Sequence, residues 1–151
     1  MITSEDVHAV IDEMAEPVLS VYLDIDNAEE SNQAANAGWR IWLKNELKRL
    51  AQEVGDPQDP VWKRQADEAE DYFLHYQPDG KALALFIGPE AIREFHLSMP
   101  LESRIAYGKP LVTPLLWLID EYEPYLIVLV GSEKTRYPQR RPGAAWVVKP
   151  V

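Results

Sequence analysis

The chain has 151 residues, a length that suits one domain, and carries 15 Lys and Arg against 25 Asp and Glu, a formal net charge of −10. It has no cysteine, which excludes disulfides, thiolate zinc sites and cysteine nucleophiles. Because so acidic a protein repels phosphate groups, we expect no direct binding to DNA and none to anionic membranes. The first residues lack the basic and apolar regions of a signal peptide, so we expect a cytoplasmic protein.

The first two predicted elements are a helix and a strand. Thr3 or Ser4 can cap a helix that reaches about residue 15, because acidic residues and then apolar residues at helical spacing follow them. The run at residues 18–25 alternates and is rich in β-branched residues, which predicts a strand. Polar residues follow this strand, so a loop is expected at its end.

Two long helices are predicted next. Apolar residues recur at helical spacing over residues 34–54 and again over residues 60–76. Asp59 and Pro60 form a helix-capping pair at the start of the second segment. We expect the two segments to form a long antiparallel helical hairpin.

The second half of the chain is richer in strands. Residues 81–87 predict a strong strand, whereas residues 94–97 and 103–107 predict two weaker ones that form an edge hairpin or meander. A helix opens at Thr113 and is followed by a wholly apolar strand at residues 125–130. This order predicts an α/β (α+β) fold, with a mixed, largely antiparallel sheet of four to five strands packed by helices.

Composition changes near the last predicted strand. We expect residues 1–124 to form one α/β domain, and residues 125–151 to hold the first strand of a truncated second domain plus an atypical basic tail. Residues 134–151 include no Asp or Glu, and a flexible or edge-pairing tail is the favoured interpretation. The alternative is a small patch that contacts RNA or a partner through Lys134, Arg136, Arg140 and Arg141.

Few residues have the spacing of a catalytic or metal site. Asp24 and Asp26, at the end of the first predicted strand, are weak candidates for Mg²⁺ or Ca²⁺ ligands, because alternate strand residues point the same way. A solvated loop is the favoured interpretation, and a metal-assisted hydrolase is the less favoured one. His8, His75 and His96 are too far apart in sequence for a helical metal site. We therefore expect no cofactor and no enzyme activity.

The aromatic residues of the two long helices have two interpretations. At helical core spacing they are typical of packing between helices and a sheet, and this interpretation is favoured over a base-stacking platform. The residues concerned are Trp39, Trp42, Trp62, Tyr72, Phe73 and Tyr76.

Several segments carry a family resemblance. They are LSVYLD at residues 19–24, WLKNEL at 42–47, KALALFIGP at 81–89, RIAYGKP at 104–110, TPLL at 113–116 and LIDEYEPYLIVLV at 118–130. Together, over roughly residues 17–130, they resemble the N-terminal domain of the bacterial branch of the archaeo-eukaryotic peptide-chain release factor superfamily.

The resemblance implies a non-catalytic, release-factor-like domain that associates with the ribosome or with a translation-related protein. The family's catalytic Gly-Gly-Gln loop and its codon-reading Asn-Ile-Lys-Ser and Tyr-x-Cys motifs have no counterpart here, so no catalytic or decoding residue is carried over. We expect a product truncated before or within the middle domain. The alternative is a stand-alone interaction or oligomerisation domain, in which residues 144–148 return as an edge strand or pair with a second copy in a homodimer.

Overall fold

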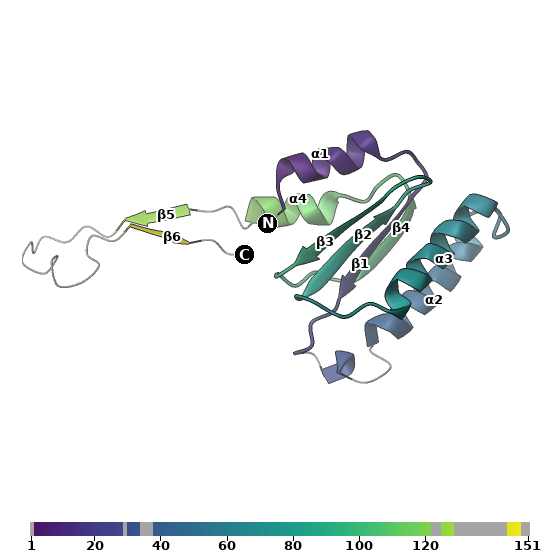
Figure 1. Cartoon of the computed structure of the whole chain (residues 1–151), viewed down its shortest axis with the longest axis horizontal. Coiled ribbons are helices and arrows are strands. Elements are labelled where there is room, and N and C mark those ends of the chain that lie inside the picture. Colours follow the sequence, from purple (N-terminus) through teal and green to yellow (C-terminus); the bar gives the residue numbers. More distant parts are fainter. Residues whose placement is uncertain (1, 29, 34–37, 122–124, 129–144, 149–151) are drawn as a thin grey trace, which may run out of the picture.

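In the computed structural model, a four-stranded sheet lies between two layers of helices (Figure 1). Helices α1 (Ser4–Glu13) and α4 (Thr113–Glu121) cover one face, and α2 (Gly38–Glu53) and α3 (Pro60–Leu74) cover the other. A short 3-10 helix, η1 (Glu30–Asn32), follows the first strand. The structure describes residues 2–28, 30–33, 38–121, 125–128 and 145–148.

The strands of this sheet are β1 (Val18–Asp24), β2 (Ala82–Ile87), β3 (Ile92–Leu97) and β4 (Arg104–Gly108), in the spatial order β3-β2-β1-β4. The central strands β1 and β2 are almost entirely apolar because helices cover both of their faces. The edge strand β3 is more polar than the central strands, and the edge strand β4 is shorter than they are. Most residues of both edge strands are exposed or half-buried.

The expected sheet needs two corrections. Each described pair of strands is antiparallel, so the expectation of a mixed sheet is wrong for this part of the chain. The main sheet also has four strands and not five. The predicted strand at residues 125–130 instead forms β5 (Tyr125–Val128), which pairs with β6 (Ala145–Val148) in a separate two-stranded sheet. The neighbour of β5 is thus a second apolar segment near the end of the chain.

The two weaker strands were expected to form an edge hairpin or a meander. They do lie at edges, but at opposite ones, since β3 pairs with β2 and β4 pairs with β1. The long helical hairpin is not shown either. Helices α2 and α3 share one face of the sheet, and their buried residues join a cluster against that face.

The core consists of two layers separated by the sheet. Along β1, Leu19, Val21 and Leu23 belong to the cluster on the α2/α3 side, whereas Val18 and Tyr22 belong to the cluster on the α1/α4 side. This alternation follows from the two-residue period of a strand. Because β4 pairs with β1, the same alternation places Ile105 and Tyr107 of β4 on the α2/α3 side.

Local capping signals are confirmed at two helices. The side chain of Thr3 accepts a 3.3 Å hydrogen bond from the N–H of Asp6, whose carboxylate accepts one of 2.8 Å from the N–H of Thr3, which completes a capping box. Asp59 caps α3 by accepting from the N–H of Trp62 at 3.4 Å. Across the described residues, no helix combines the length and the apolar character needed to cross a membrane.

Candidate functional site

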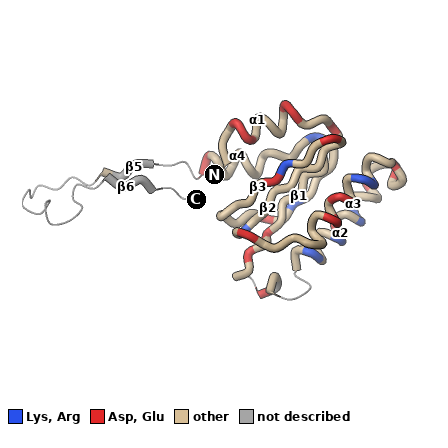
Figure 2. Tube along the Cα trace, viewed as in Figure 1, with Lys and Arg blue, Asp and Glu red and all other residues tan. Residues whose placement is uncertain are grey.

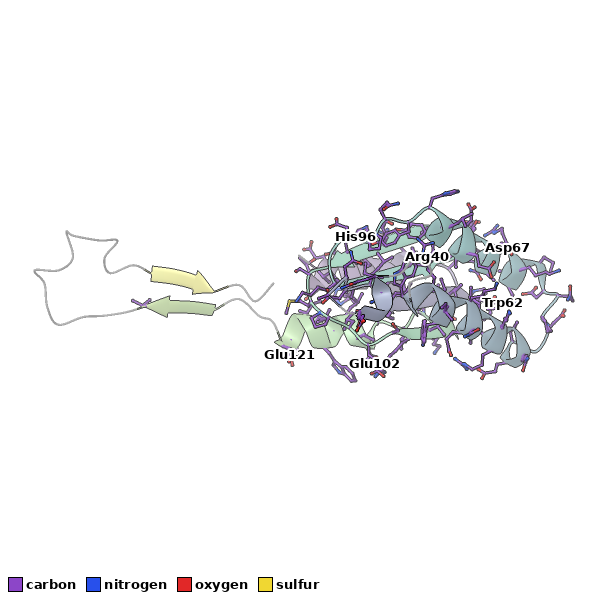
Figure 3. The ribbon with its side chains drawn as sticks, turned by 90° about the horizontal axis from the view of Figure 1, so that it is seen from below. Arg40, Trp62, Asp67, His96, Glu102 and Glu121 are labelled. Atoms are coloured by element: carbon purple, nitrogen blue, oxygen red, sulfur yellow. The ribbon has the colours of Figure 1, made fainter. Side chains whose placement is uncertain are left out.

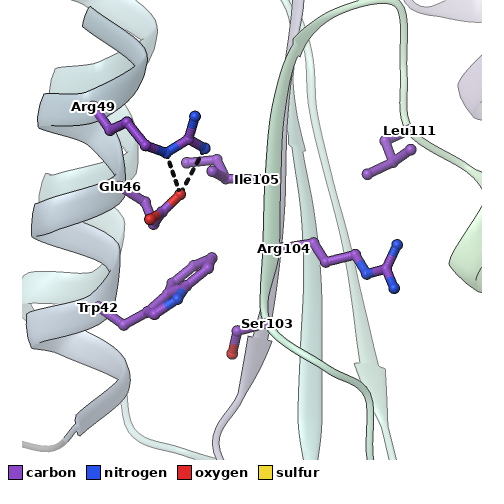
Figure 4. Close-up of a pocket in the computed structure, with 7 residues that line it drawn as sticks. All are labelled: Trp42, Glu46, Arg49, Ser103, Arg104, Ile105 and Leu111. Atoms are coloured by element: carbon purple, nitrogen blue, oxygen red, sulfur yellow. Dashed lines mark hydrogen bonds and ion pairs between the residues drawn. The ribbon is translucent and has the colours of Figure 1, made fainter.

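An open pocket of about 420 Å³ lies along the outer edge of β4. Helix α2 supplies three of its residues, and β4 with the segments just before and after it supplies the others (Figure 4). The lining residues are Trp42, Glu46, Arg49, Ser103, Arg104, Ile105 and Leu111.

The pocket wraps around the strand and does not lie on one face of the sheet. Ile105 pairs with Val21 and packs against the cluster on the α2/α3 side. Arg104, the preceding residue, lies on the opposite side, where its guanidinium is 6.0 Å from the ring centre of Trp117 in α4. Leu111 also packs on the α1/α4 side. The pocket is therefore lined by side chains from both faces of the free strand edge.

The backbone of β4 is open along this edge. Among the described strands β4 pairs with β1 alone, so the backbone groups that alternate away from β1 have no strand beside them. An edge of this kind is a template for a further strand unless side chains or a bulge block it. The side chains of Ile105 and Tyr107 are half-buried and pack against the cluster on the α2/α3 side.

Charges at the pocket are paired locally. Arg49 contacts Glu46 and Glu53, each at 2.7 Å, and the hydrogen bond to Glu46 is the main reason that the pKa of Arg49 is raised. Arg104 lies 3.2 Å from Glu102. Because each cation has a carboxylate beside it, the pocket does not gather charge of one sign, and it is poorly suited to bind a phosphate group.

Two exposed apolar side chains of α4 extend the surface beside this edge. Leu116 is 45% exposed and Trp117 is 59% exposed. Leu115, the residue before them, is fully buried against the sheet side of the helix. The sequence alone did not indicate that Leu116 and Trp117 are exposed.

A second group of polar and aromatic side chains lies at the other edge, between α3 and β3. Tyr72 donates a hydrogen bond to Glu94, and Tyr76 lies 3.3 Å from His96 Nδ1 with the two rings stacked. Burial and the hydrogen bond to Glu94 raise the pKa of Tyr72. Because Glu94 and His96 have nearly half of their side chains exposed, water competes for their contacts, and we assign the group to stabilising the β3 edge.

Asp24 and Asp26, the weak metal candidates, both accept local hydrogen bonds. Asp24 and Asp26 use one carboxylate oxygen each to accept backbone hydrogen bonds, from Asp26 at 3.1 Å and from Ala28 at 2.9 Å. Among the described residues, no group of three or more His, Asp and Glu side chains is placed to hold a metal ion. Asp24 and Asp26 thus take part in the backbone hydrogen bonds of this loop, and their role as metal ligands stays a prediction.

The other predicted contact residues, Lys134, Arg136, Arg140 and Arg141, lie outside the described residues.

The core interpretation is confirmed for four of the helix aromatics, which are at most 8% exposed. These four are Trp39, Trp62, Phe73 and Tyr76. Trp42 is half-buried, which leaves part of its side chain to line the pocket.

Comparison with known proteins assigns no relative. No protein-family model matches the chain, and no curated protein is significantly similar to it.

Proposed function

We propose that this chain is a non-catalytic binding module that takes an extended segment of a partner protein along the free edge of β4. The observation that carries the proposal is the open pocket that wraps this edge, with apolar side chains on both sides of the strand. Strand addition to an exposed sheet edge is a common mode of peptide recognition, in which backbone hydrogen bonds supply much of the affinity.

Side chains of the bound segment would alternate between two apolar surfaces. Those on the α2/α3 side meet Trp42 and Ile105, and those on the α1/α4 side meet Leu111 and Trp117. Alternation of this kind gives a strand-binding edge its specificity, because every second residue is read by the same surface. The preferred ligand is therefore an extended segment with apolar residues on both of its faces.

Selection from a peptide display library tests the proposal. We expect enriched peptides to have strand-forming sequences, and their binding to slow amide hydrogen exchange in residues 104–108. Enrichment of peptides that leave exchange in β4 unchanged would contradict the proposal, as would the failure of any peptide to be enriched.

A matched pair of substitutions gives the control. Ile105→Lys places a charge on the β4 edge, and such charges are how natural proteins block edge pairing. Ile92→Lys places the same charge at the opposite edge, on β3, where Ile92 is 48% exposed. We expect peptide affinity to fall at least tenfold in Ile105→Lys and to change less than twofold in Ile92→Lys. Equal affinities in the two variants would contradict the proposal.

For the class of partner we propose a ribosomal or translation-related protein in the cytoplasm, since the sequence resembles the N-terminal domain of bacterial release-factor-like proteins over residues 17–130. Co-sedimentation with ribosomes tests this. We expect association at low salt that Ile105→Lys weakens and Ile92→Lys does not. Absence of association at micromolar protein would contradict the ribosomal partner but leave the strand-binding proposal in place.

A further inference from the structure

We infer that the β4 edge selects a segment with a basic residue, Lys or Arg, at the position that pairs with Ile105, and that Glu46 of α2 is the residue that selects it. The inference rests on the proposed function and adds the chemistry of the bound segment. Two features carry it: the direction in which the backbone groups of β4 point, and the charge of the α2 side chains beside Ile105.

The backbone groups of β1 alternate between its two neighbours. The N–H of Ile25, just after β1, donates a 3.0 Å hydrogen bond to the carbonyl of Lys81, just before β2. Because the bonding direction alternates along a strand, the odd-numbered residues of β1 bond to β2 and the even-numbered ones bond to β4. The N–H of Asp24 agrees with this assignment, since it donates a 2.9 Å hydrogen bond to the Oγ of Ser103, which adjoins β4.

The register then decides which backbone groups of β4 are open. The even-numbered residues of β1 are opposite Arg104, Ala106 and Gly108. These three residues therefore bond to β1, whereas the N–H and C=O of Ile105 and Tyr107 point to the free edge. Residues directly opposite each other on paired strands share a face of the sheet. The residue of a bound segment that pairs with Ile105 thus extends its side chain on the α2/α3 side.

Glu46 lies on that side of the edge. Trp42 and Glu46 are four residues apart, so they are neighbours on one face of α2, and both line the pocket with Ile105 (Figure 4). Arg49 donates to Glu46 from Nε at 2.9 Å and from Nη2 at 2.7 Å, and both bonds end on Oε2. The second carboxylate oxygen, Oε1, is left to accept from a ligand. A Lys or Arg of the segment can pack its apolar stem against Trp42 and donate to this oxygen.

The charges beside Glu46 favour a basic ligand. Arg49 contacts both Glu46 and Glu53, at 2.7 Å each, so this group of three side chains carries one net negative charge. On the α1/α4 side, Arg104 is balanced by Glu102, which lies just before β4 (Figure 3). The side chain of Glu46 is 25% exposed, so water screens it less than a fully exposed carboxylate. A basic side chain is therefore attracted to the α2/α3 side, and an acidic one is repelled.

The charge of the whole domain acts in the same direction. Residues 1–128 hold 24 of the 25 acidic residues of the chain but 10 of its 15 basic ones. Figure 2 shows acidic residues on α1 and on α3, which belong to the helical layers on the two faces of the sheet. A basic segment is thus attracted before contact, which raises its association rate.

A pair of peptides that differ in one charge tests the inference. The first is the tightest peptide selected from the display library, and the second has norleucine in place of its basic residue, which keeps an apolar stem and removes the charge. Fluorescence polarisation with the full chain measures both affinities. We expect the basic residue to improve affinity at least about fivefold, since it makes a charge-assisted hydrogen bond to a partly buried carboxylate. Enriched peptides that share no Lys or Arg would overturn the inference.

Two matched variants identify the carboxylate. Glu46→Gln and Glu53→Gln each remove one negative charge beside Arg49, but of the two residues it is Glu46 that lines the pocket. In Glu46→Gln we expect the two peptides to bind within about twofold of each other, whereas Glu53→Gln keeps the full preference for the basic peptide. An unchanged preference in Glu46→Gln would overturn the inference, as would an equal loss in both variants. Circular dichroism should show that both variants stay folded.

Hydrogen exchange resolved by residue with NMR tests the register. In the free chain, we expect the amides of Arg104 and Ala106 to exchange slowly and those of Ile105 and Tyr107 to exchange quickly. Bound peptide should slow exchange at Ile105 and Tyr107 at least about tenfold, because these amides gain hydrogen bonds. Slowing confined to Arg104 and Ala106 would overturn the inference, since the residue that pairs with Ile105 then has no defined place.

The outcomes separate this inference from the proposed function. Peptides that Ile105→Lys weakens, but that gain nothing from a basic residue, overturn the inference and leave the strand-binding function intact. If no peptide is enriched, the proposed function fails and the inference fails with it. A benefit of the basic residue that is lost in Glu46→Gln and kept in Glu53→Gln supports the inference.

Discussion

The backbone N–H of Leu111 donates a 3.0 Å hydrogen bond to the Oγ of Ser20 in β1. The carbonyl of Leu111 accepts a second hydrogen bond, from the hydroxyl of Tyr22. Both side chains belong to the same face of β1, and both residues are fully buried. Together they hold the connection between β4 and α4 against the sheet, which places Leu111 in the wall of the pocket.

Ser20→Ala should lower the free energy of unfolding by about 1–2 kcal/mol, because the N–H of Leu111 loses its hydrogen-bond acceptor in a partly buried position. Urea denaturation followed by tryptophan fluorescence measures the change. The control is Ser98→Ala at an exposed serine, which should shift stability by less than about 0.5 kcal/mol. Equal effects at the two positions would contradict the anchoring role of Ser20.

Alkaline pH should destabilise the protein through Tyr22. Burial raises the pKa of Tyr22 above its ordinary value of 10.0, so the folded state disfavours the phenolate. The associated stability is fully present below pH 10.0 and is lost as the pH rises above it, by up to about 1.4 kcal/mol per pH unit. Urea denaturation at a series of pH values measures the slope, which should be smaller in Tyr22→Phe. An unchanged slope in that variant would assign the effect to other tyrosines.

Gln65→Ala should destabilise the fold by about 2–4 kcal/mol. The Nε2 of this fully buried residue of α3 donates to the carbonyls of Pro17 at 2.8 Å and Ile87 at 2.9 Å. Its removal leaves two carbonyls without this donor and opens a cavity. Chemical denaturation measures the free energy of unfolding. The matched control is Gln52→Ala, at an exposed glutamine of α2. A loss below about 0.5 kcal/mol would mean that water replaces the amide at no cost.

Thr3→Ala should cost about 1 kcal/mol, since Thr3 is the N-cap of α1 and part of its capping box. Ser4→Ala, one residue later, should be close to neutral because Ser4 is the first residue of the helix. The midpoint of thermal unfolding measures both. If the two variants rank in the reverse order, then Ser4 and not Thr3 caps α1 in solution.

Trp62 of α3 should contribute to folding stability, whereas Trp117 of α4 should contribute to peptide binding. Trp62→Ala removes a side chain that is 3% exposed and should cost about 3–5 kcal/mol of stability. Trp117→Ala removes one that is 59% exposed, so it should leave stability within about 1 kcal/mol but weaken peptide binding at the β4 edge at least tenfold. Unfolding curves and titration with a selected peptide separate the two effects. A Trp117→Ala variant with full affinity would remove α4 from the binding surface.

Most elements follow from local sequence signals, because caps and periodicity depend on residues within one or two turns. Thr3 and Asp59 cap helices as their position before acidic, proline and apolar residues predicts. The apolar runs at residues 82–87 and 125–128 form strands for the same reason. The burial of Trp39 and Trp62 also follows from their helical spacing.

The candidate site could not be predicted in this way. Residues 42–49, 103–105 and 111 are separate in the chain, and they share a pocket because β4 crosses the sheet to pair with β1 while β3 pairs with β2. Weak strands such as these have no local feature that selects a partner, since pairing depends on contacts distant in sequence.

The sequence by itself therefore determined the helices and strands, the apolar residues of the core and the acidic character of the protein, because each of these depends on composition or on neighbouring residues. The tertiary structure decided which strands pair, so that the main sheet has four strands with β3 and β4 at opposite edges. It also decided that Trp117 is exposed beside that edge. These features depend on which distant segments pack together, and a free strand edge exists only after every other pairing in the sheet has been made.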